Sequence, residues 1–182
     1  CLPPVASGLG ALFLLLAVSH LFLLPPAASS IMTAVAIGTS LALFGLAVLL
    51  RRGSVPPRWA HATAALIATL AALNSLLRLS LTGEPVQAVG LLLVIVGAGT
   101  MLVSTAWLVA LIAAILGSWA AVVLGHPSLS VGSPSAALRL ATPLVAASLL
   151  SALAHAIRLR SLRQEQALRD EQEDHKTKMD AA

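Results

Sequence analysis

Residues 86–124 read VQAVGLLLVIVGAGTMLVSTAWLVALIAAILGSWAAVVL and contain no charged side chain. As a single α-helix this stretch would be about 58 Å long, nearly twice the thickness of the hydrocarbon core of a bilayer. We therefore expect two helices, 86–103 and 106–124, folded back on each other at Ser104-Thr105-Ala106-Trp107. Such apolar helices need lipid as their solvent.

Similar apolar runs occupy most of the remaining chain. Of its 182 residues 58% are hydrophobic and only 10% are charged, whereas soluble domains carry about 25% charged residues. We expect an all-α, polytopic transmembrane bundle over residues 1–157 and a charged tail, a short polar helix, over 158–182. The expected spanning helices are 9–24, 31–50, 59–81, 86–103, 106–124 and 136–157.

The positive charges are unevenly distributed between the two sides of this bundle. Nine of the eleven Lys and Arg residues follow an even-numbered expected helix, and only Arg78 and Arg139 lie at the opposite side. Basic residues favour cytoplasmic loops, so we expect a bacterial inner-membrane protein with both chain ends in the cytoplasm. The residues expected at the inner membrane interface are Arg51, Arg52, Arg58, Trp59, Trp107, Arg158, Arg160 and Arg163.

The first residue, Cys1, is the only cysteine, which excludes an internal disulfide and a thiolate metal cluster. An N-terminal cysteine is also where bacterial lipoproteins are acylated. Lipidation of Cys1 would place the N-terminus outside, in conflict with an even helix number and a cytoplasmic tail. We favour a trimmed or partial sequence as the explanation.

Polar residues at membrane depth are costly, so they are candidates for a site. Asn74 and Arg78 lie four residues apart, hence on one helical face, with Ser75 beside them. These three residues would bind an anionic ligand from the outer side. Alternatively, Arg78 extends to the interface and pairs with Glu84 or with lipid headgroups.

Three histidines fall within the expected helices: His20, His61 and His155. Their imidazole rings could ligate a haem or a pigment, and this is the alternative to a protein without a cofactor. We expect no cofactor and no metal, because no carboxylate lies within the expected spans to orient a ligating ring.

Small residues recur on one stripe of the fourth expected helix. Gly90, Gly97 and Ser104 are spaced by seven, and Gly99 lies nearby. Small side chains let helix backbones approach closely in lipid, so we expect these four residues to be helix-packing contacts.

No catalytic pattern is found. All seven acidic residues fall in expected loops or the tail, and neither a nucleophile elbow nor a phosphate-binding glycine loop occurs. The net positive charge is not accompanied by the interleaved aromatic residues that are typical of a nucleic-acid-binding surface. We expect a non-enzymatic protein whose partners are lipids and other membrane proteins or further copies of itself, with no nucleic acid.

Several short segments carry a family resemblance. They are Arg58-Trp59-Ala60-His61, Asn74-Ser75-Leu76-Leu77, Leu81-Thr82-Gly83-Glu84-Pro85, Gln87, Val96-Gly97-Ala98-Gly99, Ser104, Trp107-Leu108, Gly117-Ser118-Trp119 and Ala156-Ile157-Arg158-Leu159-Arg160. Together they resemble the N-terminal six-helix membrane region of bacterial sensor proteins of the histidine kinase and diguanylate cyclase type. The resemblance implies a membrane anchor that feeds an output domain through a signalling helix.

Two departures from that family bear on function. Thr105-Ala106 stand where the family tends to have basic residues, and no output domain follows the tail. The chain is then either a fragment or a module acting through partners. We expect a sensor or anchor that couples membrane state or ligand to the tail. The alternative is an accessory subunit of a larger respiratory or photosynthetic membrane complex.

Overall fold

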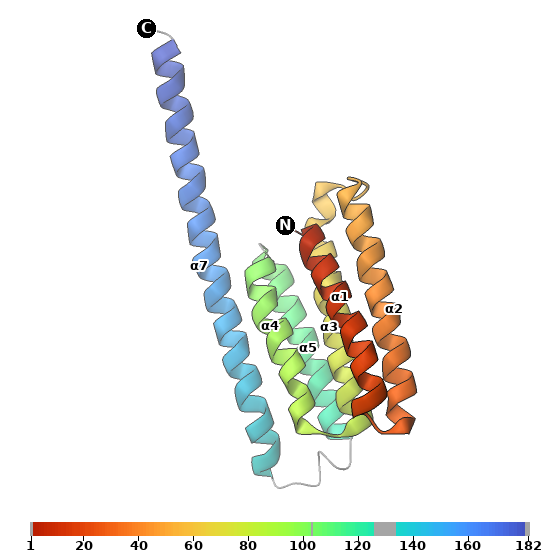
Figure 1. Ribbon diagram of the computed structural model, residues 1–182. Coiled ribbons are helices and arrows are strands. Elements are labelled where there is room, and N and C mark those ends of the chain that lie inside the picture. The colour runs from red at the N-terminus through yellow and green to blue at the C-terminus, as the bar shows by residue number, and fades with distance from the viewer. Residues whose placement is uncertain (1, 103, 126–133, 181–182) are drawn as a thin grey trace.

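The computed structural model describes residues 2–102, 104–125 and 134–180, and over these residues every regular element is a helix (Figure 1). The expected all-α bundle is confirmed. Six α-helices and two 3₁₀ turns make up the described chain. They are α1 (Leu2–Leu23), α2 (Pro26–Arg51), η1 (Pro57–Trp59), α3 (Ala60–Thr82), η2 (Pro85–Ala88), α4 (Val89–Met101), α5 (Thr105–Gly125) and α7 (Pro134–Asp180).

Two helices begin earlier than the hydropathy pattern indicates. The first helix starts at Leu2 rather than residue 9, and the second at Pro26 rather than residue 31. Proline is compatible with a first helical turn, where its missing N–H would have no partner in any case. The third helix ends at Thr82 and is capped by Gly83, which has a left-handed φ of 63° and donates its N–H to the Leu79 carbonyl.

The turn between α4 and α5 lies earlier than residues 104–107. Leu102 has an extended backbone and α5 begins at Thr105, so Thr105-Ala106-Trp107 form the first turn of a helix. The cause is a contact from far along the chain: the ring of His155 bonds to the Leu102 carbonyl and to Thr105 Oγ1, at 2.9 and 3.0 Å.

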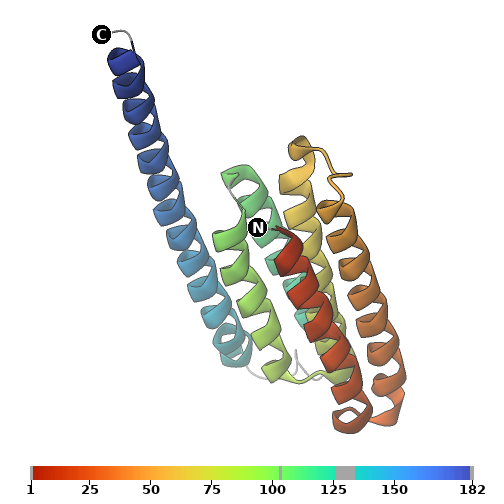
Figure 2. The ribbon, with the colours of Figure 1, turned by 45° about the horizontal axis from the view of Figure 1, so that its top comes forward.

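The last helix, α7, runs without a break for 47 residues and continues through Pro143 (Figures 1 and 2). The expected separation between a spanning helix ending at 157 and a tail helix is therefore absent. Residues after Ile157 are rich in Arg, Leu, Gln, Glu and Ala, all strong helix formers, so the change in polarity does not end the helix.

Five of the helices are long and apolar enough to cross a membrane, and a sixth apolar segment, Val86–Met101, is shorter. Large apolar side chains such as Leu15, Phe22 and Leu149 point outward and are mostly exposed. This outward-facing apolar surface fits a multi-pass membrane protein, because lipid rather than water can surround it.

Successive helices run in opposite directions, so the turns gather at two ends (Figure 1). The N-terminus, the α2–α3 loop and the α4–α5 turn lie at one end, and α7 leaves the bundle there. We call this the basic end, because Arg51 ends α2 there and Arg52 and Arg58 lie in the α2–α3 connection. The α1–α2 and α3–α4 turns lie at the opposite end.

Close contacts hold the helices together in two groups. In the α1–α2 hairpin, Ser29 Oγ and Ser40 Oγ donate to the carbonyls of His20 and Gly10, at 3.0 and 2.8 Å. In the second group α4 packs along α7, and a Cβ added at Gly99 would collide with the backbone carbonyl of Ser151. Such close approach is available only to glycine.

This contact predicts that Gly99→Ala destabilises the bundle. The Ser151 backbone cannot move aside as a side chain could, so we expect a loss of about 1–3 kcal/mol in the free energy of unfolding. Unfolding by dodecyl sulfate in mixed micelles measures it. Gly117→Ala is the matched control, because a Cβ there meets nothing within 4 Å. Equal stability of the two variants would show that α4 and α7 do not pack in this register.

Candidate functional site

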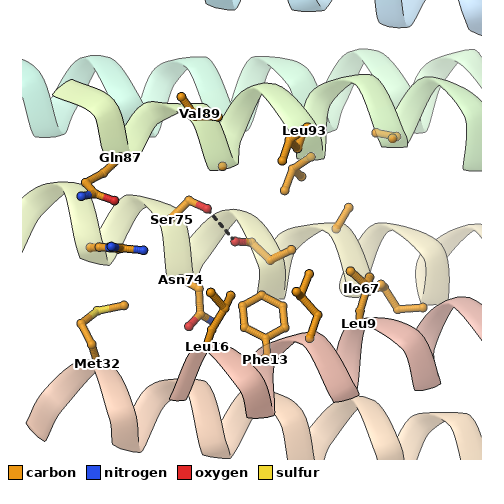
Figure 3. Close-up of a pocket in the computed structure, with 18 of the residues that line it drawn as sticks. Leu9, Phe13, Leu16, Met32, Ile67, Asn74, Ser75, Gln87, Val89 and Leu93 are labelled. Atoms are coloured by element: carbon orange, nitrogen blue, oxygen red, sulfur yellow. Dashed lines mark hydrogen bonds between the residues drawn. The ribbon is translucent and has the colours of Figure 1, made fainter. Parts of the chain in front are cut away.

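A cavity of about 540 Å³ lies between α1, α3 and α4 and reaches the start of α2. This volume lies within the range of ligand pockets, roughly 300–1,000 Å³. The cavity is elongated, since it is lined from Arg78 and Gln87 at the opposite end of the bundle to Val5 and Met101 near the basic end. Figure 3 shows its central part.

The polar lining is concentrated at one end of this cavity. Asn74, Ser75 and Gln87 lie together there, whereas Leu9 and Ile67 lie toward the other end (Figure 3). The same polar end includes His20, three residues before the end of α1, and Arg78, four residues before the end of α3. The cavity therefore has a polar head and an apolar body.

The candidate residues expected from the sequence, Asn74, Ser75 and Arg78, all line this cavity. Asn74 is positioned by two bonds: Nδ2 donates to Thr39 Oγ1 on α2 at 2.7 Å and to the Leu70 carbonyl at 3.1 Å. Ser75 Oγ donates to the Ala71 carbonyl at 3.3 Å. The structure thus brings the three expected residues into one site, and adds His20 and Gln87 to them.

Three polar atoms at this site are buried without a hydrogen-bond partner among the described residues: His20 Nδ1, Asn74 Oδ1 and Arg78 Nε. The side chains of His20 and Asn74 are only 3% and 6% exposed. Buried polar atoms are nearly always bonded in folded proteins. Three residues that line one cavity therefore each carry a buried polar atom without a partner.

Arg78 forms no ion pair with any residue in the described part of the chain. The acid expected beside it, Glu84, instead accepts a hydrogen bond from Gln87 Nε2 at 2.8 Å. Arg78 thus leaves an uncompensated positive charge at the polar head of the cavity, where a negative charge would be stabilised.

The cavity opens sideways rather than into the interior. Leu12 on α1 and Leu93 on α4 both line it, yet they are 48% and 71% exposed. The two side chains form the rim of a lateral opening toward the surface that lipid would cover. A hydrophobic molecule could enter from the bilayer without crossing water.

The small residues expected to pack helices are found in different surroundings. A Cβ at Gly90 would collide with Ser75 Oγ of α3, and one at Gly99 with Ser151 of α7. A Cβ at Gly97 would meet nothing within 4 Å, because Gly97 faces the cavity. Ser104 lies in the α4–α5 turn, where its carbonyl accepts the Leu108 N–H. Gly97 and Ser104 thus differ from the expected packing role.

The histidines are separated. Both ring nitrogens of His155 are hydrogen-bonded, to the Leu102 carbonyl and to Thr105 Oγ1, while His61 lines a second cavity at the basic end together with Arg158. Among the described residues no group of three or more His, Cys, Asp or Glu side chains could hold a metal ion. The structure brings none of the three histidines together.

The residues expected at the inner interface gather at the basic end. Arg51 ends α2, and Arg52 and Arg58 follow in the α2–α3 connection. Trp59, at the end of η1, and Trp107, in the first turn of α5, are about half exposed. In α7, Arg158, Arg160 and Arg163 follow Ile157, the last apolar residue of the bundle segment. Cys1 lies outside the described residues.

Comparisons of the chain with protein-family models, with curated proteins and with solved structures found no match. The fold and the site together define a polytopic helical membrane protein with a lateral amphipathic cavity.

The His155 contacts predict the effect of His155→Phe. Phenylalanine fills a similar volume but leaves the Leu102 carbonyl and Thr105 Oγ1 without their partner, so we expect a loss of about 1–3 kcal/mol in stability. The midpoint of detergent-induced unfolding measures this loss. His61→Phe is the control, since none of the described residues hydrogen-bonds to the His61 ring. Unchanged stability of His155→Phe would contradict the role of this ring in the α4–α5 turn.

Proposed function

We propose that this chain is a non-catalytic sensor and anchor module of a bacterial inner membrane, in which the state of the cavity is communicated to the C-terminal part of α7. The observation that carries the proposal is the position of α4. This helix forms one wall of the cavity, and it also packs along α7, which continues unbroken beyond the bundle (Figure 2).

Two different faces of α4 support this coupling. Gly90, Leu93 and Gly97, spaced by three and four residues, line the cavity. Gly99 contacts Ser151, and Leu102 accepts the bond from His155. A shift of α4 caused by an occupant would therefore press directly on α7. Packed helix interfaces tend to switch between discrete arrangements rather than deform continuously.

α4 is also the shortest α-helix of the described chain. It has 13 residues, against 21 or more in each of the other α-helices of the described chain. Its length is about 20 Å, less than the roughly 30 Å of bilayer hydrocarbon. Because α4 packs against α3, α5 and α7 as well as lining the cavity, a shift of α4 would be transmitted to all three helices.

The orientation follows from the charges. With the basic end in the cytoplasm, the C-terminal part of α7 is cytoplasmic and the polar head of the cavity faces the outer leaflet. The resemblance to the membrane regions of bacterial kinases and cyclases supports the same arrangement, since those proteins pass signals through the helix that leaves the membrane.

The test is to fuse a diguanylate cyclase domain after Arg163 and to insert one to seven alanines at the junction. Each added residue rotates the fused domain by about 100°, so we expect activity to rise and fall with insertion length and to recover after seven residues. Cyclase activity in membranes is the readout, and Asn74→Ala should shift the level of the uninserted fusion.

The cyclase domain alone, carrying the same insertions, is the control, and its activity should not change with insertion length. Constant activity across all insertions and in Asn74→Ala would reject the sensor role. Co-purification of the native chain with large membrane partners in fixed stoichiometry would then favour the accessory-subunit role.

A further inference from the structure

We infer that the cavity binds a single-chain amphiphile from the membrane whose headgroup carries both a negative charge and a hydroxyl or amide donor. This ligand class deepens the proposed sensor function and rests on it for its biological meaning. Charge, hydrogen bonding and shape each support one part of the inference.

The negative charge follows from Arg78. Its guanidinium lines the polar head, its Nε is buried without a partner, and the described residues supply no counter-charge. Glu84, the nearest acid in the sequence, is engaged by Gln87. A buried or half-buried Arg is stabilised most by a bidentate anion such as a carboxylate or a phosphate.

The hydrogen-bond donor follows from Asn74. Its Nδ2 donates to the Leu70 carbonyl, which can only accept, so the amide cannot be turned over without losing that bond. Its Oδ1 is consequently an acceptor without a donor, on a residue that lines the cavity. A simple carboxylate brings no donor, whereas a headgroup hydroxyl or amide N–H would satisfy Asn74. His20 Nδ1 can donate or accept according to its tautomer, and so suits either group.

The single chain follows from the shape. Gly90 and Met101 of α4 both line the cavity, and the eleven-residue step between them measures about 17 Å along a helix. The cavity volume of about 540 Å³ is therefore drawn out along the helix rather than rounded. This elongated shape suits one extended acyl chain rather than two lying side by side.

The lateral opening of the cavity and the position of its polar head both suit a lipid ligand. The rim at Leu12 and Leu93 faces the bilayer, so the chain can slide in laterally. Arg78 lies about 6 Å inside the end of α3, close to the depth of lipid headgroups. A headgroup there places its tail along Phe13 and Ile67 toward the basic end, parallel to the tails of outer-leaflet lipids.

The experiment measures binding to the purified, delipidated full chain by native mass spectrometry with four lipids. Palmitoyl lysophosphatidylglycerol has the charge, the donor and one chain. Palmitate lacks the donor, monopalmitoylglycerol lacks the charge, and dipalmitoyl phosphatidylglycerol has two chains. We expect one lysophosphatidylglycerol to bind per protein. Each of the other three lipids should bind with an affinity at least about tenfold lower.

Two pairs of variants locate the bound lipid. Arg78→Gln should weaken binding of lysophosphatidylglycerol about 10- to 100-fold, the usual value of a charged hydrogen bond. Arg78→Lys keeps the charge but not the bidentate geometry, so it should weaken binding less than Arg78→Gln does. Arg58→Gln, at the basic end, is the charge-matched control. Gly97→Leu fills the apolar body and should abolish binding of palmitoyl lysophosphatidylglycerol but not of octanoyl lysophosphatidylglycerol, a fifth lipid with a shorter chain. Gly117→Leu, outside the cavity, is its control.

Each contrary result removes a defined part of the inference. If palmitate binds as tightly as lysophosphatidylglycerol, the headgroup needs no hydrogen-bond donor. If monopalmitoylglycerol does so, it needs no negative charge. If dipalmitoyl phosphatidylglycerol does so, the cavity does not select a single chain. No saturable binding, or binding unchanged in Arg78→Gln and Gly97→Leu, overturns the site itself. Lipid binding that leaves the activity of the fused cyclase unchanged would reject the sensor role but not the lipid site. The two failures can be told apart, because the insertion experiment needs no added lipid.

Discussion

Hydrocarbon can neither donate nor accept a hydrogen bond, and every polar group within the bundle must find its partner inside the protein. Several of the described hydroxyl groups do so locally. Ser7, Ser19 and Thr82, for example, donate to carbonyls three or four residues back in their own helices. Other polar side chains bridge helices and fix their register, as Asn74 does between α3 and α2.

The same constraint makes the exceptions informative. His20, Asn74 and Arg78 come from two helices that are far apart in sequence, and each leaves an atom unpartnered at the head of one cavity. The other two unpartnered side-chain atoms in the described residues, Trp119 Nε1 and Ser151 Oγ, do not line it. Unpartnered polar atoms that gather around one cavity point to a binding site, whereas unpartnered atoms scattered through a core do not.

The fold could be predicted largely from local features. Apolar runs separated by prolines, glycines and arginines were enough to identify the helices and to indicate which turns share an end. Asn74 and Arg78 were also visible, because polar residues stand out in an apolar run. Three features depended on distant contacts and were missed. His20 joins Asn74 only through tertiary packing, Gln87 enters through η2, and the α4–α5 turn is placed by His155. The continuity of α7 was missed for another reason: polarity changes at Arg158, but helix propensity does not.

The length of α7 has a mechanical consequence. His155 is the last of its residues hydrogen-bonded to the α4–α5 turn, and the helix extends 25 residues further to Asp180. A rod of that length reaches about 38 Å, so a tilt of about 5° at the bundle displaces its tip by about 3 Å. The helix is thus a lever arm whose fulcrum is the His155 contact, able to magnify a sub-ångström displacement in the membrane into one the size of a side chain.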